Sequence, residues 1–254
     1  MKRILLQEVK QNLCRLKMND MAAELEQALE IAGKNREGHL TFLDNLVKKQ
    51  VKGVNDRSLQ RRIKKADFPE ILTFENFDWG FQPGLNVEYV KDLAQLGFIE
   101  KRHPLLIFGK TGTGKTHLAI ALGIRACEFK YHVAFYTAQD LLRQLHATLL
   151  NDTTNQLIAE ITRLDLLILD ALGFIRTKPE YASLLFDLVN ACRQRVSLIV
   201  TSNISFEEWG QTMGNPSVTN AIVDRLFEKA CLINIRSGRS YRTEGPNAPK
   251  LTSE

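Results

Sequence analysis

Long apolar stretches are missing from the sequence. The apolar runs are short, such as Leu166–Leu169 and Leu198–Val200, whereas a membrane-spanning helix needs about 18 to 20 apolar residues. No apolar segment follows the start at Met1–Ile4, as it does in a secretory signal. These absences argue against a membrane protein and against secretion. We therefore expect a cytoplasmic protein with no membrane partner.

Cysteine is scarce and scattered. The four cysteines, at 14, 127, 192 and 231, lie too far apart in sequence for a zinc-binding pair, so we expect free and mostly buried thiols. Extremes of composition are missing too. Hydrophobic residues make up 44% and charged residues 25%, which excludes a disordered chain, a collagen-like fibre and a coiled-coil rod. A length of 254 residues allows one large domain, or a core with a small accessory domain.

The first 70 residues carry a helical pattern. Apolar residues recur at helical spacing from Met18 to Ala32, and a second amphipathic helix begins at Leu40. Pro69 ends this pattern. We predict a small all-helical domain over residues 1–70 that contacts DNA or a partner.

The second of these predicted helices continues into a strongly basic stretch. Between Lys48 and Lys65, eight basic residues stand against one acid, Asp56, within a chain of net charge +5. Such a run is usually a solvated helix face, but this imbalance favours contact with nucleic-acid phosphates. If about half of these charges neutralise phosphates of a duplex, log affinity falls with log salt at a slope of roughly −3 to −4. The candidate DNA-binding residues are Lys48, Lys49, Lys52, Arg57, Arg61, Arg62, Lys64 and Lys65.

The residue pattern changes at two further points, near residue 71 and near residue 104. Residues 71–103 begin with four aromatic residues between Phe74 and Phe81, and we predict a connector whose aromatics anchor it to the next domain or line a ring-binding slot. From Pro104, short apolar runs alternate with helical patterns, which is typical of a parallel α/β sheet flanked by helices. We predict this domain over residues 104–243 and a flexible tail over 244–254. The predicted strands are Leu105–Phe108, His132–Tyr136, Asp165–Leu169, Ser197–Thr201 and Cys231–Ile235.

A phosphate-binding loop follows the first predicted strand. Four residues separate Gly109 from Gly114-Lys115-Thr116, with an apolar strand before the motif and an apolar helix after it. Glycines let consecutive backbone N–H groups face a phosphate, and the following helix adds its positive end. Lys115 can reach the β- and γ-phosphates of ATP, and the Thr116 hydroxyl can bind Mg²⁺. The predicted nucleotide-binding residues are Gly109, Lys110, Thr111, Gly112, Thr113, Gly114, Lys115, Thr116 and His117.

An aspartate at the end of another strand completes a P-loop site. Four apolar residues, Leu166–Leu169, lead directly into Asp170, which we expect beside the loop, holding Mg²⁺ through its water shell. Many ATPases of this kind place a second carboxylate next in sequence to activate the attacking water, but position 171 is Ala. Loss of a general base costs a factor of about 10² to 10⁴ in rate. We therefore expect ATP to bind, and hydrolysis to be impaired unless another acid substitutes.

Three further polar residues are candidates for catalysis. Asn203 follows the fourth predicted strand, where it could bond the γ-phosphate or the attacking water, or else cap the next helix. Arg225 lies in a helical stretch and Arg242 follows the last predicted strand. Arginine stabilises charge on a phosphoryl group, but a lone arginine is normally a solvated surface residue.

These residues together resemble the IstB/DnaC branch of the AAA+ ATPases. The resemblance runs from the P-loop through Leu166–Asp170, Thr201–Asn203, Asp224–Leu226 and Gly238–Arg242. The N-terminal part is similar to IstB rather than DnaC, through Leu16-Lys-Met-Asn-Asp-Met-Ala, Phe42-Leu, and Phe74-Glu-Asn-Phe77-Asp78. IstB is the helper ATPase of one family of bacterial insertion sequences.

The resemblance implies a role for each site residue. Asn203 would be the sensor-1 residue, Arg225 the arginine finger acting on ATP in the adjacent subunit, and Arg242 the sensor-2 residue. The fold would be an AAA+ P-loop domain without the usual C-terminal helical lid. Copies of the chain would form a homo-oligomer on double-stranded DNA, with ATP at each subunit interface, and would recruit an IstA-like transposase. The loop carrying Arg176 and Lys178 would face the DNA.

Three alternatives stay open. A DnaC-like helicase loader would grip a replicative helicase and prefer single-stranded DNA. A small-molecule kinase also has a P-loop, but no motif for an acceptor is visible and the basic N-terminal region would have no role. Ala171 leaves open a scaffold that binds ATP and DNA without hydrolysis.

Overall fold

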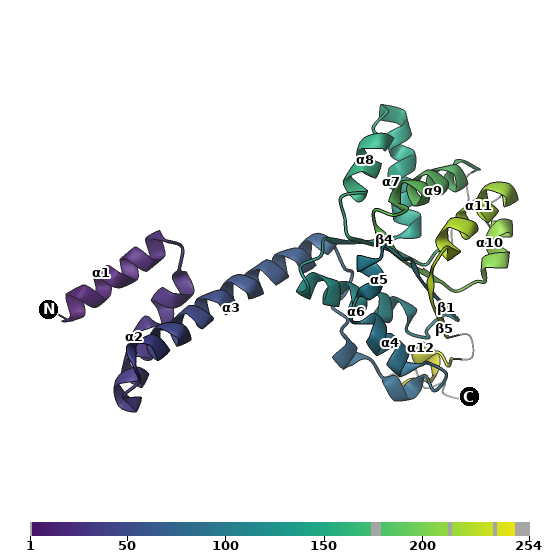
Figure 1. Cartoon of the computed structure of the whole chain (residues 1–254). Helices are drawn as coiled ribbons and strands as arrows, with labels where there is room; N and C mark the ends of the chain where they lie inside the picture. Colours follow the sequence, from purple (N-terminus) through teal and green to yellow (C-terminus); the bar gives the residue numbers. More distant parts are fainter. Residues whose placement is uncertain (1, 174–178, 213–214, 236–237, 247–254) are drawn as a thin grey trace, which may run out of the picture. The chain divides into compact units, whose positions relative to one another are not determined.

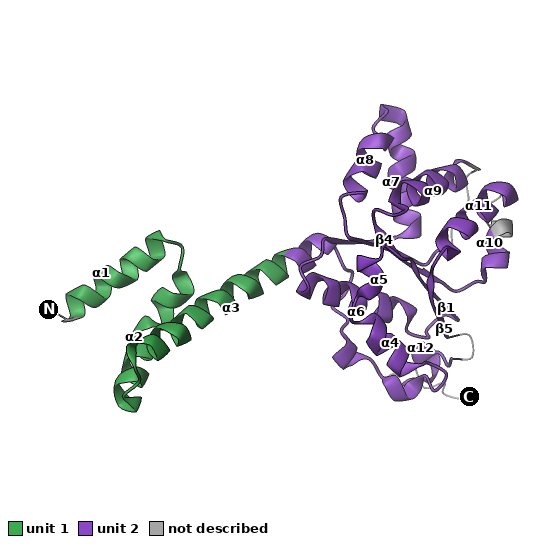
Figure 2. Cartoon of the chain, in the orientation of Figure 1, with its two compact units in different colours: residues 1–61 green, residues 62–254 purple. Residues whose placement is uncertain are grey.

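The chain folds into two compact units. A computed structural model describes residues 2–173, 179–212, 215–235 and 238–246 (Figure 1). Unit 1 comprises residues 1–61 and unit 2 comprises residues 62–254 (Figure 2). The residues predicted as a connector, 71–103, are therefore part of unit 2. Among the described residues, no helix is both long and apolar enough to cross a membrane.

Unit 1 consists of helices, as its apolar spacing predicts. They are α1 (Lys2–Arg15), α2 (Asn19–Asn35) and the first part of α3 (His39–Ala66), which runs on into unit 2. Its small core is built by Met21 and Leu25 of α2 and Leu46 of α3. The buried side chain of Gln50 also ties α3 to α2, because its Oε1 accepts hydrogen bonds from the backbone N–H groups of Asp20 and Met21. These are orphan donors of the first turn of α2.

Unit 2 is centred on a parallel sheet. Its strands are β1 (Leu105–Gly109), β2 (Val133–Thr137), β3 (Leu166–Asp170), β4 (Ser197–Ser202) and β5 (Cys231–Ile235), in the spatial order β2-β3-β4-β1-β5. Every neighbouring pair is parallel. The five predicted strands and the α/β class are thus confirmed. The three inner strands β1, β3 and β4 are buried at every position, which explains their apolar runs.

Helices cover both faces of this sheet (Figure 1). Alternate strand residues such as Leu106, Leu167 and Val200 belong to one core cluster with residues of α7 (Ala138–Thr148), α9 (Pro179–Cys192) and α11 (Pro216–Phe227). On the other face α6 (Lys115–Glu128) packs against β1 to β4. The remaining segments of this part are η3 (Leu149–Asn151), α8 (Thr154–Ile161), α10 (Phe206–Thr212) and α12 (Tyr241–Glu244).

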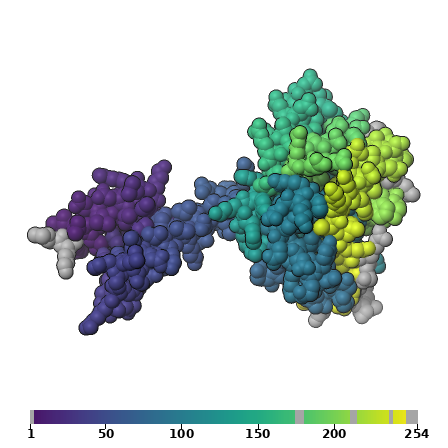
Figure 3. All heavy atoms as spheres, viewed as in Figure 1, coloured from purple at the N-terminus to yellow at the C-terminus, as the bar shows by residue number. Residues whose placement is uncertain are grey.

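The segment before β1 forms four short elements. These are η1 (Phe74–Asn76), η2 (Trp79–Phe81), α4 (Val87–Leu93) and α5 (Gly97–Glu100). In the space-filling view, this segment lies beside the yellow C-terminal residues of unit 2 (Figure 3). The Phe81 ring packs on the Tyr241 ring with centroids 4.9 Å apart, and Gln82 donates a 2.7 Å hydrogen bond to the carbonyl of Arg239. The segment before β1 therefore packs against the segment that follows β5.

The strand order fixes where a ligand can bind. Since β4 lies between β1 and β3, the carboxyl ends of these three strands are adjacent. The P-loop follows β1, Asp170 ends β3, and Asn203 follows β4. This is the edge of an open α/β sheet at which ligands bind.

Candidate functional site

The P-loop curls between β1 and α6. Gly112 and Gly114 have φ of +80° and +92°, values that residues other than glycine rarely adopt. A Cβ at Gly114 would also lie 2.7 Å from Cε2 of Phe77. The loop is tied internally, because the Thr113 hydroxyl and the Lys115 ammonium group each donate a 2.8 Å hydrogen bond to the Lys110 carbonyl.

Lys115 is a buried cation at the start of α6. Its relative exposure is 9%, and burial lowers the pKa of its ammonium group. The negative charge of Asp170 raises this pKa, and the nearby Arg242 lowers it again. A group in this environment gains stability when an anion binds beside it. The site is therefore suited to a phosphate.

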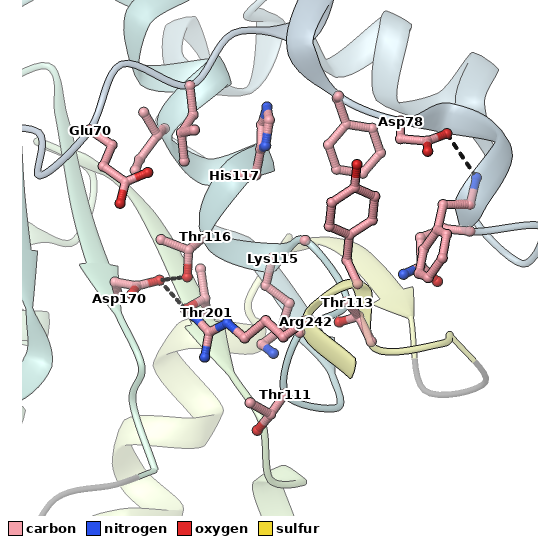
Figure 4. A pocket seen from close by; sticks show the side chains of 18 of the residues that line it. Glu70, Asp78, Thr111, Thr113, Lys115, Thr116, His117, Asp170, Thr201 and Arg242 are labelled. Atoms are coloured by element: carbon pink, nitrogen blue, oxygen red, sulfur yellow. Dashed lines mark hydrogen bonds between the residues drawn. The ribbon is translucent and has the colours of Figure 1, made fainter. Parts of the chain in front are cut away.

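A short hydrogen-bond network joins the ends of β3, β4 and α6 (Figure 4). Oδ1 of Asp170 accepts hydrogen bonds from the Thr116 hydroxyl at 2.8 Å and from the Thr201 hydroxyl at 2.7 Å. Thr201 in turn accepts the backbone N–H of Ala171 at 2.9 Å. Thr201 was not predicted as a site residue, although its place at the end of a strand beside Asn203 was a visible signal.

The network opens into a cavity of about 560 Å³. One wall comes from the segment before β1 and another from α12. His117 fixes the first wall, because its Nε2 lies 2.8 Å from the Thr73 carbonyl and its ring packs edge-on against Phe77. The second wall is tied to the P-loop, since the Tyr241 N–H donates a 2.8 Å hydrogen bond to the Gly112 carbonyl. Residues of the predicted connector, such as Phe77 and Phe81, thus line the cavity.

The cavity fits a nucleoside triphosphate with Mg²⁺. Lys115 and Arg242 supply positive charge, and Thr116 with Asp170 offers the oxygen ligands that Mg²⁺ takes alongside phosphate oxygens. Asn203 also lines the cavity, and its buried Oδ1 has no hydrogen-bond partner among the described residues. The described residues contain no group of three or more His, Cys, Asp or Glu side chains placed to hold a metal. A metal ion here would therefore be bound jointly with phosphate oxygens.

The family model described as IstB-like ATP binding protein matches residues 11–247. The chain belongs to this family. The match includes the cavity and most of the helical unit 1. This match confirms the resemblance to the IstB family, and it confirms the prediction that the chain is an ATP-binding protein.

Curated members of the IstB-like family are similar over most of the chain. The ATP-binding protein of insertion sequence IS21 from Pseudomonas aeruginosa is 35% identical over 230 residues, 91% of this chain and 86% of that protein. The ATP-binding protein of insertion sequence IS232 from Bacillus thuringiensis is 31% identical, over 93% of this chain and 94% of that protein.

Solved structures share the fold of this IstB-like chain. AMPPCP-bound DnaA from Aquifex aeolicus matches with a TM-score of 0.55 and 26% identity over 69% of this chain, and the match spans about half, 52%, of that DnaA chain. The structure of DnaI matches with a TM-score of 0.52 at 18% identity, which shows the fold alone. The AAA+ type of the P-loop domain is thereby confirmed.

Arg225 lies outside the cavity of its own chain. Its guanidinium group sits 4.5 Å from the ring centroid of Phe186, and it donates hydrogen bonds to Oδ1 of Asn190 at 3.3 Å and to the Ala221 carbonyl at 2.9 Å. Arg242, by contrast, lines the cavity. The IstB-like chain therefore holds its two predicted catalytic arginines in different places.

The predicted DNA-binding residues differ in whether they have hydrogen-bond or ion-pair partners within the protein. All eight between 48 and 65 lie on α3. Four of them have protein partners: Lys48 pairs with Asp44, Lys49 with Glu24, Arg57 with Asp20, and Arg62 donates to the Cys127 carbonyl. Lys52, Arg61, Lys64 and Lys65 are exposed and have no hydrogen bond or ion pair with a described residue. Arg176 and Lys178 lie outside the described residues.

Proposed function

We propose that this chain is an ATP-hydrolysing helper of DNA transposition. In this proposal it binds ATP and Mg²⁺, assembles with copies of itself on duplex DNA, and recruits a transposase of the IstA type. The observation that carries the proposal is similarity to insertion-sequence ATP-binding proteins over 230 or more residues, which takes in both units rather than the P-loop domain alone.

The geometry of the cavity supports a separate role in ATP binding for each of its polar residues. Lys115 and the backbone of the P-loop would hold the β- and γ-phosphates. Thr116 and Asp170 would hold Mg²⁺, which neutralises charge on the phosphates when bound. Asn203 would donate from its side-chain NH2 group to the γ-phosphate, or orient the attacking water, whose O–H its unpartnered amide oxygen can accept. Arg242 would add positive charge from α12. The related DnaA fold binds AMPPCP, an ATP analogue, which supports this use of the site.

The position of Arg225 supports assembly. An arginine held on α11, outside its own cavity, can serve a nucleotide only if that nucleotide belongs to another copy of the chain. A stacked and hydrogen-bonded guanidinium is also pre-organised for such a contact. We assign Arg225 to the phosphates of the adjacent subunit.

DNA contact would come from the helical region. Residues 1–70 would bind DNA and the transposase, 71–103 would join them to the ATPase, and 104–243 would hold ATP. Lys52, Arg61, Lys64 and Lys65 are the best candidates for phosphate contact, because they have no protein partner among the described residues. Arg176 and Lys178 keep their assignment as a second contact.

One experiment distinguishes the proposed transposition helper from a helicase loader and from a scaffold that does not hydrolyse ATP. The full chain is mixed with duplex or single-stranded DNA, with ATP or ADP, and imaged by electron microscopy, while tagged transposase and replicative helicase are tested for capture. We expect ATP-dependent oligomers on duplex DNA that retain the transposase. Preference for single strands with capture of the helicase would replace the proposal by a helicase loader. Oligomers without turnover would favour the ATP-gated scaffold that Ala171 suggests.

A further inference from the structure

The residue after Asp170 cannot activate water. Ala171 lines the cavity at the place where a water-activating carboxylate is expected, and its methyl group neither accepts nor donates a proton. Its backbone is fixed with φ of +60°, and its N–H is committed to Thr201. A general base for hydrolysis in this cavity must therefore come from a residue other than 171.

Three carboxylates line the described part of the cavity: Glu70, Asp78 and Asp170. The last two accept hydrogen bonds from other groups of the protein. Asp170 accepts hydrogen bonds from two threonine hydroxyls. Asp78 caps η2, since its side chain accepts the N–H of Phe81 at 3.1 Å. Glu70 is exposed and makes no hydrogen bond or ion pair with any described residue. In the close view Glu70 lies on the side of Thr116 and Asp170, whereas Asp78 lies on the opposite side (Figure 4).

Glu70 is held in place by anchors on both sides. Before it, the Phe68 ring packs edge-on against the Phe135 ring with centroids 6.3 Å apart, and it fills the space that a side chain at Gly123 would need. After it, the Thr73 carbonyl is bound by His117. The segment between these anchors is therefore positioned by α6 and by the sheet, and it carries one carboxylate over the cavity. Such support by packing is what a catalytic group needs.

We propose that Glu70 is the general base of ATP hydrolysis in this chain, in place of the acid missing at position 171. The inference rests on the proposed function. The oxygen of a water molecule attacks the γ-phosphorus while the bond from this phosphorus to the β–γ bridging oxygen breaks. ADP keeps the electron pair of that bond, and the Glu70 carboxylate takes a proton from the attacking water.

The test compares Glu70→Gln with the wild-type chain. Turnover of ATP and the Kd of AMPPCP with Mg²⁺ are measured on the full chain, together with the ratio of ATP to ADP that stays bound. We expect turnover to fall by about 10² to 10⁴, the AMPPCP Kd to stay within about twofold, and unhydrolysed ATP to accumulate on the variant. Ala171→Glu in the Glu70→Gln background should restore turnover. Glu88→Gln is the control, because Glu88 belongs to α4, pairs with Lys91 and does not line the cavity.

Each other result has a defined meaning. Unchanged turnover in Glu70→Gln overturns the inference. A Kd that weakens in step with turnover also overturns it, since Glu70 would then bind the nucleotide rather than activate water. A wild-type chain that binds AMPPCP but hydrolyses no ATP overturns the inference and leaves nucleotide binding intact. A wild-type chain that binds no AMPPCP contradicts the proposed function itself.

Discussion

The Thr116 hydroxyl donates a 2.8 Å hydrogen bond to Oδ1 of Asp170, which joins the start of α6 to the end of β3. A second hydroxyl, from Thr201, donates to the same carboxylate oxygen. The carboxylate is thus oriented from two sides beside the Thr116 oxygen. Two oxygens placed in this way can contribute to one Mg²⁺ site, Thr116 directly and Asp170 through water.

Replacing Asp170 by Asn should remove most of the benefit of Mg²⁺ for nucleotide binding. The amide keeps the shape of the side chain but loses its charge, and loss of such a supporting partner weakens metal affinity by about 10- to 100-fold. Calorimetry of AMPPCP binding with Mg²⁺ and with a chelator would measure this. Equal Mg²⁺ dependence in wild type and Asp170→Asn would remove Asp170 from the metal site.

Gly114→Ala should abolish nucleotide binding. At φ of +92° a Cβ carries a strain of about 1–2 kcal/mol, and it would press on the Phe77 ring at 2.7 Å. Adding Phe77→Ala relieves the contact but not the backbone strain, so AMPPCP affinity should recover only in part. Gly97→Ala is the matched control, because a Cβ there meets nothing within 4 Å. Full recovery in the double variant would mean that the ring contact alone excludes a side chain.

The sequence predicts the sheet well, and with it the edge at which the polar residues that follow the strands meet. Buried parallel strands are apolar throughout, and the polar residues that end them, such as Asp170 and Asn203, converge because parallel strands share one carboxyl edge. Long-range contacts leave no such pattern. Arg57 pairs with Asp20, 37 positions away in sequence. One cation of the basic stretch between residues 48 and 65 therefore has a partner within the protein, which the sequence pattern does not reveal. The place of Glu70 depends on a loop path set by packing of Phe68, which no local spacing reveals.

Unit 1 should lose stability when Gln50 is replaced by Ala. This change leaves the N–H groups of Asp20 and Met21 without their acceptor at the start of α2, which costs about 1–2 kcal/mol in the free energy of unfolding. Urea unfolding of the full chain followed by circular dichroism would detect it. Gln60→Ala, on an exposed position of the same helix, should change stability by less than about 0.5 kcal/mol. Similar stability of both variants would show that water replaces the Gln50 cap.

Arg225→Ala should separate nucleotide binding from assembly. Because Arg225 lies outside its own cavity, the AMPPCP affinity of the single chain should stay within about twofold, whereas ATP-dependent oligomers should disappear from sedimentation profiles. Arg193→Ala is the control, since Arg193 lies in the same surface hollow and pairs with Glu228. Normal oligomers and turnover in Arg225→Ala would reduce this residue to a surface arginine packed on Phe186.

The unpaired cations of α3 should carry the salt dependence of DNA binding. Each contact with a duplex phosphate contributes about −0.9 to the slope of log affinity against log salt, so removing four contacts should reduce the slope by about 3 to 4. The test variant replaces by alanine the four residues without a described partner, Lys52, Arg61, Lys64 and Lys65.

The control for this variant replaces Lys48 and Lys49, which belong to the same helix but pair with Asp44 and Glu24. Exposed ion pairs of this kind contribute little to stability, so the control chain should fold normally and keep a slope within about one unit of the wild type. Fluorescence anisotropy of labelled duplex DNA over a range of salt concentrations measures both slopes. If the two variants lose slope equally, pairing within the protein does not select the residues that contact DNA.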